Sequence, residues 1–533
     1  MNILMLYPKF PGETFWSLTR STETFMHRSA NMPPLGLLTL ASYLPDDFLV
    51  RVIDRNMSNE TEADWQWADV VFLSLMLAQE DDGGVCLRNA RAHGKPVAIG
   101  GPYTHARPDI AASVDWVCFG EAESIVDDFV ADLRANRRGR QYDGGNKTDM
   151  EQVRVPRFDL LTNVNDYLSM SVQFSRGCPF RCEFCDIIEI YGRVARTKTP
   201  AQVLAELALL DQLGFHGYVF LVDDNFIGNK RRAKELLKEL AAWNIEHAHP
   251  FKYFTEASIN LADDEALLDA MADAGVLQVF IGIETPDRTL LKNMLKMQNV
   301  PGDPLVKLNR IRSYGIHILG GFIVGFDGED LGVFDSQRSF VQASGIGLAM
   351  LGLLQAVPHT QLARRLKHEG RLLEDVEVQG ISTVNGLNFI PKGSVTKRMY
   401  LEEYGRLVNT LYSPELFFER VMRGMMALRP RLSLLFRLKQ SRSDLPALLR
   451  LIRYMGFKEK GIRSCFWRAL AGVLWRNPGA LEAFVWDCYG FYCLREHVVY
   501  IQHELARYLA SPAPGDVLDR VVPVLESTPV AMV

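Results

Sequence analysis

Three cysteines stand within eight positions of the segment SRGCPFRCEFCDI, at Cys178, Cys182 and Cys185. Three soft thiolates on one tight loop favour an iron–sulfur cluster or a zinc ion over a hard cation. A structural zinc site needs four ligands. The histidines that would have to complete it are His216, His247 and His249. A four-iron cluster bound by three cysteines keeps one iron free of protein ligands, so the spacing favours such a cluster over zinc.

The elements around the cysteines predict the fold that positions them. Six strand patterns, each followed by a helical pattern, run through residues 166–384, and the cysteines come directly after the first strand. Six units are too few for an eight-stranded barrel, so we expect a partial (β/α)6 barrel with its chemistry at the carboxyl ends of the strands. The helices are expected over residues 200–213, 230–243, 263–273, 303–313, 330–343 and 360–370.

The segment CPFRCEFC, with Phe184 before the last cysteine, resembles the signature of the radical S-adenosylmethionine (SAM) superfamily. Further motifs resemble that superfamily in order along the barrel: VDDNFIGNK, TEAS, GIETP and GFIVGF. The resemblance implies that the open iron chelates SAM and that an electron cleaves SAM to a 5′-deoxyadenosyl radical. It also implies a SAM site formed by Phe184, Asp223, Asp224, Asn225, Glu256, Glu284 and Gly321.

Residues 1–135 alternate short apolar strands with helical patterns, beginning with MNILMLYP. Such strands predict a parallel sheet with helices on both faces, which is a doubly wound, Rossmann-like α/β domain. These sheets bind ligands beyond the carboxyl ends of their strands, where the turns SLMLAQ, GGPYTH and FGEAES are expected. The candidate ligand-binding residues in these turns are Ser74, Met76, Gln79, Gly100, Gly101, Pro102, Gly120 and Glu121. Residues 136–165 are polar and are interpreted as a linker.

A doubly wound domain before a radical SAM barrel is similar to the cobalamin-binding branch of the superfamily. The motifs above, with LLQAVPHTQLARRLKHEGRL, NFIP and YSPELFFER further along, resemble the subgroup that contains the hopanoid methylases. The resemblance implies that cobalamin takes a methyl group from one SAM and that the radical from another SAM prepares an unactivated carbon to receive it. Cobalamin domains with a cobalt-ligating histidine carry Asp-x-His-x-x-Gly, whereas the turn here is DRNMSN, at residues 54–59. Cobalamin would therefore bind without a histidine below cobalt, held by the eight turn residues named above.

Residues 385–533 are expected to form a helical C-terminal domain with an uneven charge. The whole chain carries −5, but residues 420–468 hold thirteen Lys and Arg against Asp444 and Glu459, which gives +11 and leaves −16 for the rest. Leu, Phe and Trp lie between these cations, which is typical of a helix on a membrane surface. A solvated helical face and a nucleic-acid surface are alternatives, and the second fits less well.

The composition, 48% hydrophobic and 23% charged, is that of a globular protein, and no apolar run reaches the roughly 18 residues that span a bilayer. Clustered thiols indicate a reducing compartment, so we expect a cytoplasmic protein with peripheral contact to the inner face of the membrane. The five cysteines outside the cluster loop are interpreted as small buried hydrophobes. Cys488 and Cys493 have a second interpretation, in which they bind a thiophilic substrate together.

The sequence therefore predicts a cobalamin-dependent radical SAM C-methyltransferase that acts on a small molecule or a hopanoid-like lipid. An external electron donor such as a flavodoxin or ferredoxin is expected as its partner. Three alternatives keep the cluster: a cobalamin-independent enzyme that uses an adenosyl or aminocarboxypropyl radical, a tRNA-modifying enzyme, and a non-catalytic iron–sulfur sensor. The helical tail does not resemble an RNA-binding module, and the SAM motifs are intact, which disfavours the last two.

Overall fold

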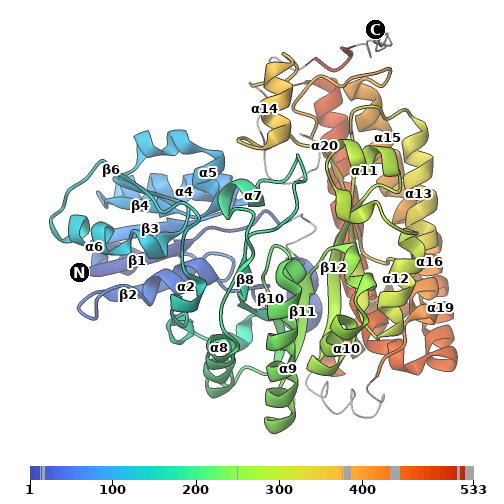
Figure 1. Cartoon of the computed structure of the whole chain (residues 1–533), viewed down its shortest axis with the longest axis horizontal. Coiled ribbons are helices and arrows are strands. Elements are labelled where there is room, and N and C mark those ends of the chain that lie inside the picture. Colours follow the sequence, from blue (N-terminus) through green and yellow to red (C-terminus); the bar gives the residue numbers. More distant parts are fainter. Residues whose placement is uncertain are drawn as a thin grey trace, which may run out of the picture.

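The computed structural model describes residues 1–12, 14, 18–248, 250–374, 376, 378, 386–431, 445–512 and 517–522. It has an N-terminal sheet domain, a central barrel, and a layer of C-terminal helices on the side of the barrel away from the N-terminal domain (Figure 1). This arrangement confirms the predicted α/β fold class, with its Rossmann-like domain, partial barrel and helical C-terminal region.

The N-terminal domain is built on six parallel strands in the order β2-β1-β3-β4-β5-β6. The strands are β1 (Asn2–Tyr7), β2 (Leu49–Asp54), β3 (Val70–Ser74), β4 (Val97–Gly100), β5 (Trp116–Phe119) and β6 (Arg140–Asp143). An order that begins 2-1-3-4-5 is a doubly wound arrangement, in which the carboxyl ends of the strands form one ligand-binding edge.

Helices cover both faces of this sheet. They are α2 (Leu35–Ala41), α3 (Glu62–Trp67), α4 (Glu80–Ala92), α5 (Pro102–Ala106) and α6 (Val126–Arg134), whereas the short α1 (Thr19–Ser21) packs against the C-terminal helix α20 (Leu481–Ala510). Leu37 of α2 and Phe129 of α6 pack in the apolar core on one face. Trp65 of α3 and Ala90 of α4 pack in the core on the other face.

The segment 136–165, interpreted as a linker, contains β6, which pairs with β5 at the edge of the sheet. Its sequence, Arg-Gln-Tyr-Asp, has one buried residue, Tyr142, and three exposed ones. An edge strand this short and polar lacks the apolar pattern that identified the other strands. The linker interpretation was therefore incomplete, and the predicted domain limits stay predictions.

The barrel also has six parallel strands, in the order β14-β13-β12-β11-β10-β7. They are β7 (Ser169–Val172), β10 (Gly217–Leu221), β11 (Phe251–Glu256), β12 (Val276–Glu284), β13 (His317–Val324) and β14 (Ala349–Leu353). A separate antiparallel ribbon pairs β8 (Ser175–Arg176) with β9 (Arg196–Thr197). The sheet is open between β7 and β14, as expected for a partial barrel.

The barrel helices begin where local signals predict them. They are α7 (Ile187–Ile190), α8 (Pro200–Gln212), α9 (Lys230–Glu246), α10 (Glu265–Ala274), α11 (Arg288–Asn293), α12 (Pro304–Ser313), α13 (Gly332–Ser344) and α14 (Gln361–His368). A capping box between Thr199 and Gln202 starts α8, with Pro200 in its first turn. Gly275, with φ of 86°, ends α10.

The C-terminal helices are α15 (Lys397–Leu411), α16 (Pro414–Ala427), α18 (Leu445–Arg453), α19 (Arg463–Arg476) and α20 (Leu481–Ala510). Helix α20 contacts the residues that begin the barrel strands, because Lys252 donates to Glu482 at 2.7 Å and His317 lies 3.0 Å from Asp487. This helix therefore closes the amino-terminal end of the barrel, opposite the expected active face. None of the described helices is both long and apolar enough to cross a membrane.

Arg420, the first cation of the segment expected to lie on a membrane, is fully buried on α16. Its guanidinium donates to the backbone carbonyls of Ile346, Gly347 and Leu411. A side chain that links α16 to the residues before β14 in this way cannot face a bilayer. The range 420–468 is therefore too wide as a membrane surface, and residues 432–444 of it lie outside the described part of the chain.

Candidate active site

The three cysteines lie on a loop, residues 177–195, that the β8–β9 ribbon closes at its base. Gly177 opens the loop with φ of 92°, and a Cβ there would lie 2.6 Å from the carbonyl oxygen of Val194. The backbone N–H of Cys178 donates to the carbonyl of Gly192 at 3.2 Å. Only glycine fits such a crossing of two chain segments, so the turn before the first cysteine is set by the sequence Arg-Gly-Cys.

The surroundings of the thiols suit thiolates bound to metal. Asn225 Nδ2 donates to Cys178 Sγ at 3.7 Å, and Gln298 Nε2 donates to Cys182 Sγ at 3.5 Å. The ammonium of Lys296 interacts electrostatically with Cys182 and Cys185. Amide donors and a cation next to cysteine sulfurs are the means by which proteins tune iron–sulfur clusters. The donor set therefore fits the predicted cluster.

Burial raises the pKa of the Cys178 thiol and raises that of Cys185 well above its ordinary value. Buried thiols of this kind stay protonated until a metal displaces the proton. Across the described residues, no three or more His, Cys, Asp or Glu side chains converge as the ligands of a metal ion. A zinc ion completed by His216 or His247 does not fit the fold, because both residues lie before the strands β10 and β11, at the end of the barrel opposite the cysteine loop. His249 lies outside the described residues.

Three carboxylates gather at the carboxyl ends of β10 and β11. Asp223 Oδ1 accepts hydrogen bonds from the backbone N–H groups of Phe174 and Ser175 at 2.8 and 2.7 Å, and Asp224 accepts from Gly177 at 3.2 Å. Burial raises the pKa of Asp223 to about 7 and that of Asp224 to about 6.

Glu256 lies beside these two aspartates at the end of β11. Burial raises its pKa to about 8, and the charges of Asp224 and Asp223 act in the same direction. Three carboxyl groups that share a buried site create a demand for positive charge and for hydrogen-bond donors. A ligand with an amino group and hydroxyls fits this demand, which is what the predicted SAM site requires.

Glu284 ends β12 with φ of 65° and forms a buried ion pair with Lys296. The pairing of β12 with β13 shifts register between Gly282 and Glu284, so the strand end is irregular. The Lys296 ammonium also lies 5.7 Å from the ring centroid of Phe184. Glu284 and Phe184 are thus joined through a lysine that the sequence analysis missed, and their contact with SAM stays a prediction.

Gly321 on β13 has no room for a side chain, because a Cβ there would lie 2.9 Å from the ring of Phe280.

Lys296 and Gln298 come from the segment after α11, in the sequence Leu-Lys-Met-Gln-Asn. Nothing in that pattern indicates proximity to cysteines more than a hundred residues earlier. Only the fold brings them to the cluster loop.

The eight residues predicted to bind cobalamin all lie at the carboxyl edge of the N-terminal sheet. Six of them lie in the turns of this edge, whereas the side chains of two others are hydrogen-bonded to protein groups. Met76 is 43% exposed after β3, and Gly101 turns the chain into α5 with φ of 90°. A Cβ at Gly101 would lie 2.7 Å from Ser74 Oγ. Glycine at this position therefore leaves the edge without a projecting side chain. Of the other three residues in these turns, Gly120 is exposed, whereas Gly100 and Pro102 are half-buried.

Gln79 and Glu121 of the same set are engaged with protein groups. Gln79 is fully buried, accepts from the backbone N–H of Met76 at 2.9 Å and donates to the carbonyl of Pro8. Both oxygens of the Glu121 carboxylate accept hydrogen bonds from Arg196. Their contact with a corrin stays a prediction, although their side chains already have other partners.

A cavity of about 790 Å³ lies between the N-terminal domain and the open edge of the barrel. The N-terminal domain contributes Arg107 and Asp109 to its wall, while His359, Arg364 and Leu372 come from the barrel side. Arg364 also pairs with Glu189 of the cluster loop at 2.7 Å. A cavity of this size, next to the cluster loop, can hold a bulky substrate with an apolar body and a polar end.

Cys488 and Cys493, the pair with a second interpretation, lie on α20 at the opposite end of the barrel. Cys488 is fully buried, and Cys493 Sγ lies 2.9 Å from Ser21 Oγ. The other isolated cysteines are buried as well, as expected for small hydrophobes. The structure therefore buries Cys488 and Cys493 at the end of the barrel opposite the cysteine loop, which fits small hydrophobes and does not support a shared site for a thiophilic substrate.

Comparison with known proteins agrees with this geometry. Residues 172–335 match the model of the radical SAM superfamily, and residues 360–507 match a domain of unknown function, DUF4070. An uncharacterized methyltransferase of Synechocystis sp. is 42% identical over 491 residues, which are 92% of this chain and 90% of that protein. The hopanoid C-2 methylase of Rhodopseudomonas palustris is 38% identical over 385 residues, covering 70% of this chain and 71% of that protein.

Among solved structures, OxsB, a cobalamin-dependent SAM radical enzyme with aqua-cobalamin and SAM bound, aligns with a TM-score of 0.60 at 14% identity. The alignment covers 97% of this chain and 84% of that one, so the likeness extends to the whole fold. The superfamily match and the two curated relatives identify the chain as a radical SAM enzyme of the methyltransferase family that includes hopanoid C-2 methylase.

Proposed function

We propose that the chain transfers a methyl group to an unactivated carbon of a polycyclic lipid of the hopanoid type. The observation that carries the proposal is the placement of the cysteine loop. It lies between the buried carboxylates Asp223, Asp224 and Glu256 of the barrel and the carboxyl edge of a doubly wound domain. Similarity to hopanoid C-2 methylase supports the choice of substrate class.

Each cofactor has residues that would hold it. Cys178, Cys182 and Cys185 would bind a [4Fe–4S] cluster, and the carboxylates at the ends of β10 and β11 would bind the amino and hydroxyl groups of SAM. The flat edge formed by Ser74, Met76, Gly100, Gly101 and Pro102 would face cobalamin. When bound, these groups supply a reducing electron, a source of a carbon radical and a transferable methyl group.

The protein's own part is to position and to shield. Asp223 and Asp224 hold the backbone of the ribbon and the start of the cluster loop, which fixes the loop over the mouth of the barrel. Glu256, with a pKa of about 8, is neutral at pH 7 until a cationic group arrives, so it can donate a hydrogen bond as well as accept one. The cavity beside the loop would hold the lipid.

Anaerobic reconstitution tests this function. Protein supplied with iron, sulfide, cobalamin, SAM, reduced flavodoxin or ferredoxin and a hopanoid lipid should form S-adenosylhomocysteine, 5′-deoxyadenosine and methylated lipid. The Cys182→Ala variant should lose all SAM cleavage. If 5′-deoxyadenosine forms while no corrin is retained, the cobalamin-independent alternative is correct. If both products form without any methylated lipid across a panel of polycyclic lipids, the substrate class is wrong.

We further propose that α18, the π-helical turn η12 (Tyr454–Lys458) and α19 contact a membrane. Large apolar side chains are exposed there, among them Leu449 (59%), Phe457 (64%) and Trp475 (90%). The exposed cations on and between the same elements are Arg453, Lys458, Lys460, Arg463, Arg468 and Arg476. Cations beside exposed aromatic and aliphatic groups suit an anionic bilayer, at roughly 1 kcal/mol per cation near its surface.

Vesicle flotation checks the membrane contact. Trp475→Asp should reduce binding to vesicles that contain anionic lipid, because it places a negative charge at the most exposed aromatic ring. Val306→Asp is the matched control, since Val306 is 64% exposed on α12, which is not one of these elements. Equal loss in both variants, or no binding of the unmodified chain, would refute the proposal.

A further inference from the structure

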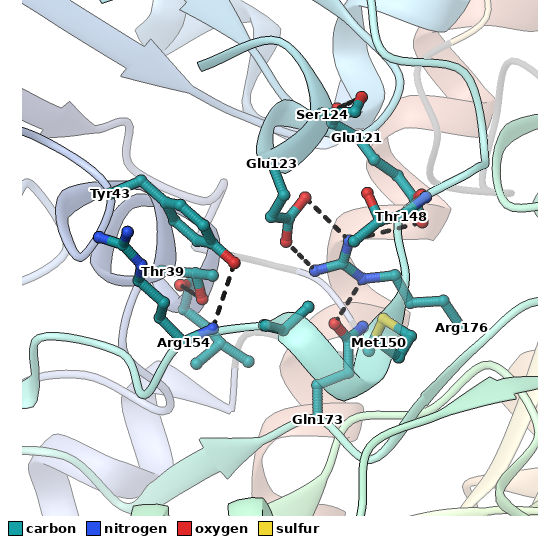
Figure 2. A network of polar contacts seen from close by, with 12 residues as sticks. Thr39, Tyr43, Glu121, Glu123, Ser124, Thr148, Met150, Arg154, Gln173 and Arg176 are labelled. Atoms are coloured by element: carbon teal, nitrogen blue, oxygen red, sulfur yellow. Dashed lines mark hydrogen bonds and ion pairs between the residues drawn. The ribbon is translucent and has the colours of Figure 1, made fainter. Parts of the chain in front are cut away.

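Two arginines of the β8–β9 ribbon, Arg176 and Arg196, reach across to the loop that follows β5. Figure 2 shows Arg176 with its partners Glu123 and Gln173. Arg176 Nη1 and Nη2 donate to the two carboxylate oxygens of Glu123 at 3.1 and 2.6 Å, and its Nε donates to Gln173 at 2.8 Å. Arg196 Nη1 and Nη2 donate to the carboxylate of Glu121 at 2.8 and 2.7 Å. Arg176 also lies 3.4 Å from Glu121, so the four charged side chains form one network. We call Glu121, Glu123, Arg176 and Arg196 the ribbon clamp.

The ribbon clamp is buried and fully hydrogen-bonded. None of its four side chains is more than 17% exposed, and the Glu121 side chain is fully covered. Every carboxylate oxygen accepts from an arginine, and Glu121 Oε2 also accepts from the backbone N–H of Thr148 at 2.8 Å. Buried charges are tolerated only when they are paired this completely, so removing one member leaves its partner uncompensated. Burial raises the pKa of Glu121, yet hydrogen bonds from Arg196 and the charge of Arg176 keep it below its usual value.

The two arginines are direct partners in the ribbon, where Arg176 pairs with Arg196. They therefore stand at the two ends of the loop that carries the cysteines, and Arg176 is two residues before Cys178. On the barrel side, Asp223 holds the backbone just before Arg176, and Asp224 holds the backbone just after it. The base of the cluster loop is therefore bonded to both the N-terminal domain and the barrel.

The glutamates belong to the edge of the N-terminal sheet that is proposed to face cobalamin. They follow Gly120, whose φ is 67° and whose Cβ would lie 2.5 Å from the carbonyl oxygen of Gly145. The backbone N–H of Glu121 donates to that same carbonyl at 3.0 Å, which fixes the turn. A clamp at this place determines the position of this sheet edge, which is proposed to face cobalamin, relative to the cluster loop. Misplacement of reacting groups by about 1 Å can cost about a hundredfold in rate.

We propose that the ribbon clamp fixes the separation of the two cofactor sites, and that its four members are positioning residues for methyl transfer. This inference rests on the proposed function for its catalytic meaning, but the clamp itself is a property of the chain. Glu121 thereby acquires a role as a link between domains, while its predicted contact with cobalamin stays a prediction.

Hydrogen exchange of the protein without cofactors gives the first test. Glu123→Gln and Glu121→Gln should speed exchange by about tenfold or more at residues 119–124 and at 174–178 together, since a charged hydrogen bond contributes about 1.5–3 kcal/mol. Asp132→Asn is the matched control, because Asp132 is 4% exposed and pairs with Arg137 inside the N-terminal domain. It should loosen only its own surroundings. Unchanged exchange in the ribbon of both glutamate variants would overturn the clamp, and so would equal loosening of the ribbon in the control.

The loaded enzyme gives the second test. Pulsed electron paramagnetic resonance between the reduced cluster and Co(II) should report a narrow distance distribution in the unmodified chain and in Asp132→Asn, and a broad one in Glu123→Gln. The ratio of 5′-deoxyadenosine to methylated product should rise by about tenfold to a hundredfold in Glu123→Gln, with the iron content unchanged. Arg176→Lys, which keeps the charge but loses the two-pronged contact, should give an intermediate ratio.

These outcomes separate the two proposals. A chain that retains no corrin fails the proposed function, while hydrogen exchange still decides on the clamp. A chain that methylates with unchanged distance distribution and unchanged product ratio in Glu123→Gln keeps its function and refutes the positioning role. Loss of the folded state in Glu123→Gln moves both measurements to Arg176→Lys, in which an unchanged ratio likewise refutes that role.

Discussion

Glu329 controls one part of the pH dependence of stability. It lies in the turn after β13, where its carboxylate accepts a hydrogen bond from the backbone N–H of Gly325 at 2.7 Å. Gly325 has φ of 111°, and the Glu329 side chain is 5% exposed, so the contact secures a strained and buried turn. Burial raises the pKa of Glu329 from 4.5 to about 8. The folded protein therefore holds this proton at neutral pH, whereas the unfolded chain releases it.

The sign and size of the effect follow from this difference. A carboxyl group with a raised pKa contributes stability that is fully present below about pH 4.5 and is lost as the pH rises through about 8. Between these limits the free energy of unfolding should fall by about 1.4 kcal/mol per pH unit. The total is about 5 kcal/mol, which is an upper value because the unfolding of a large multidomain chain is not a two-state transition.

Glu329→Gln should remove this slope. Glutamine has nearly the same shape, keeps a carbonyl oxygen for the Gly325 N–H and cannot ionise, so the variant should match the unmodified protein at pH 5 and exceed it at pH 8. Denaturation midpoints in guanidinium chloride at both pH values measure the difference. Glu419→Gln, an exposed acid on α16, is the control and should run parallel to the unmodified protein. Parallel curves for Glu329→Gln as well would refute the assignment of a raised pKa.

Three further changes have definite outcomes. Gly101→Ala should weaken cobalamin retention, measured by absorbance after gel filtration. The sheet edge proposed to face the corrin must shift to admit a Cβ at positive φ, at a cost of roughly 1–2 kcal/mol. Gly94→Ala has a similar φ of 63° but open space around its Cβ, and should leave retention unchanged. Arg420→Met should lower the free energy of unfolding by about 3 kcal/mol or more, seen in denaturation midpoints, because three buried carbonyls lose their donor. Gln298→Leu should lower the midpoint potential of the reconstituted cluster in a redox titration, since it removes a hydrogen bond to Cys182 Sγ.

The barrel was predictable because its signals are local. Each of its six expected helices begins within two residues of the predicted position. N-cap residues such as Thr199 and Asp303 start these helices by local hydrogen bonds that do not depend on the rest of the fold. Strand β6 was not predicted, because its pairing depends on β5 and on no pattern of its own. The cysteines of the cluster loop were predictable for the same local reason. Lys296 and Gln298 were not, since only the fold brings them near.

The basic segment shows why composition alone misplaces a charge. Arg420 is buried against backbone carbonyls, and Arg431 pairs with Asp269 and Asp273 of α10. Both count toward the excess of +11, yet neither is available to a membrane. Counting cations indicates a surface, but whether each one faces solvent depends on acceptors that come from distant parts of the chain.

Glu121 raises the same question at the site itself. An acidic residue at the carboxyl edge of a doubly wound sheet has two kinds of partner, a ligand in the crevice or the domain that faces it. The sequence places Glu121 at the correct edge but gives no means to choose between them. The available signal was in the other domain, where Arg176 and Arg196 flank the cysteine loop and have their carboxylate partners outside it. Arginines at the base of a cofactor loop therefore favour one interpretation of an acid in the domain that precedes the loop. The acid pairs with these arginines and does not bind a ligand.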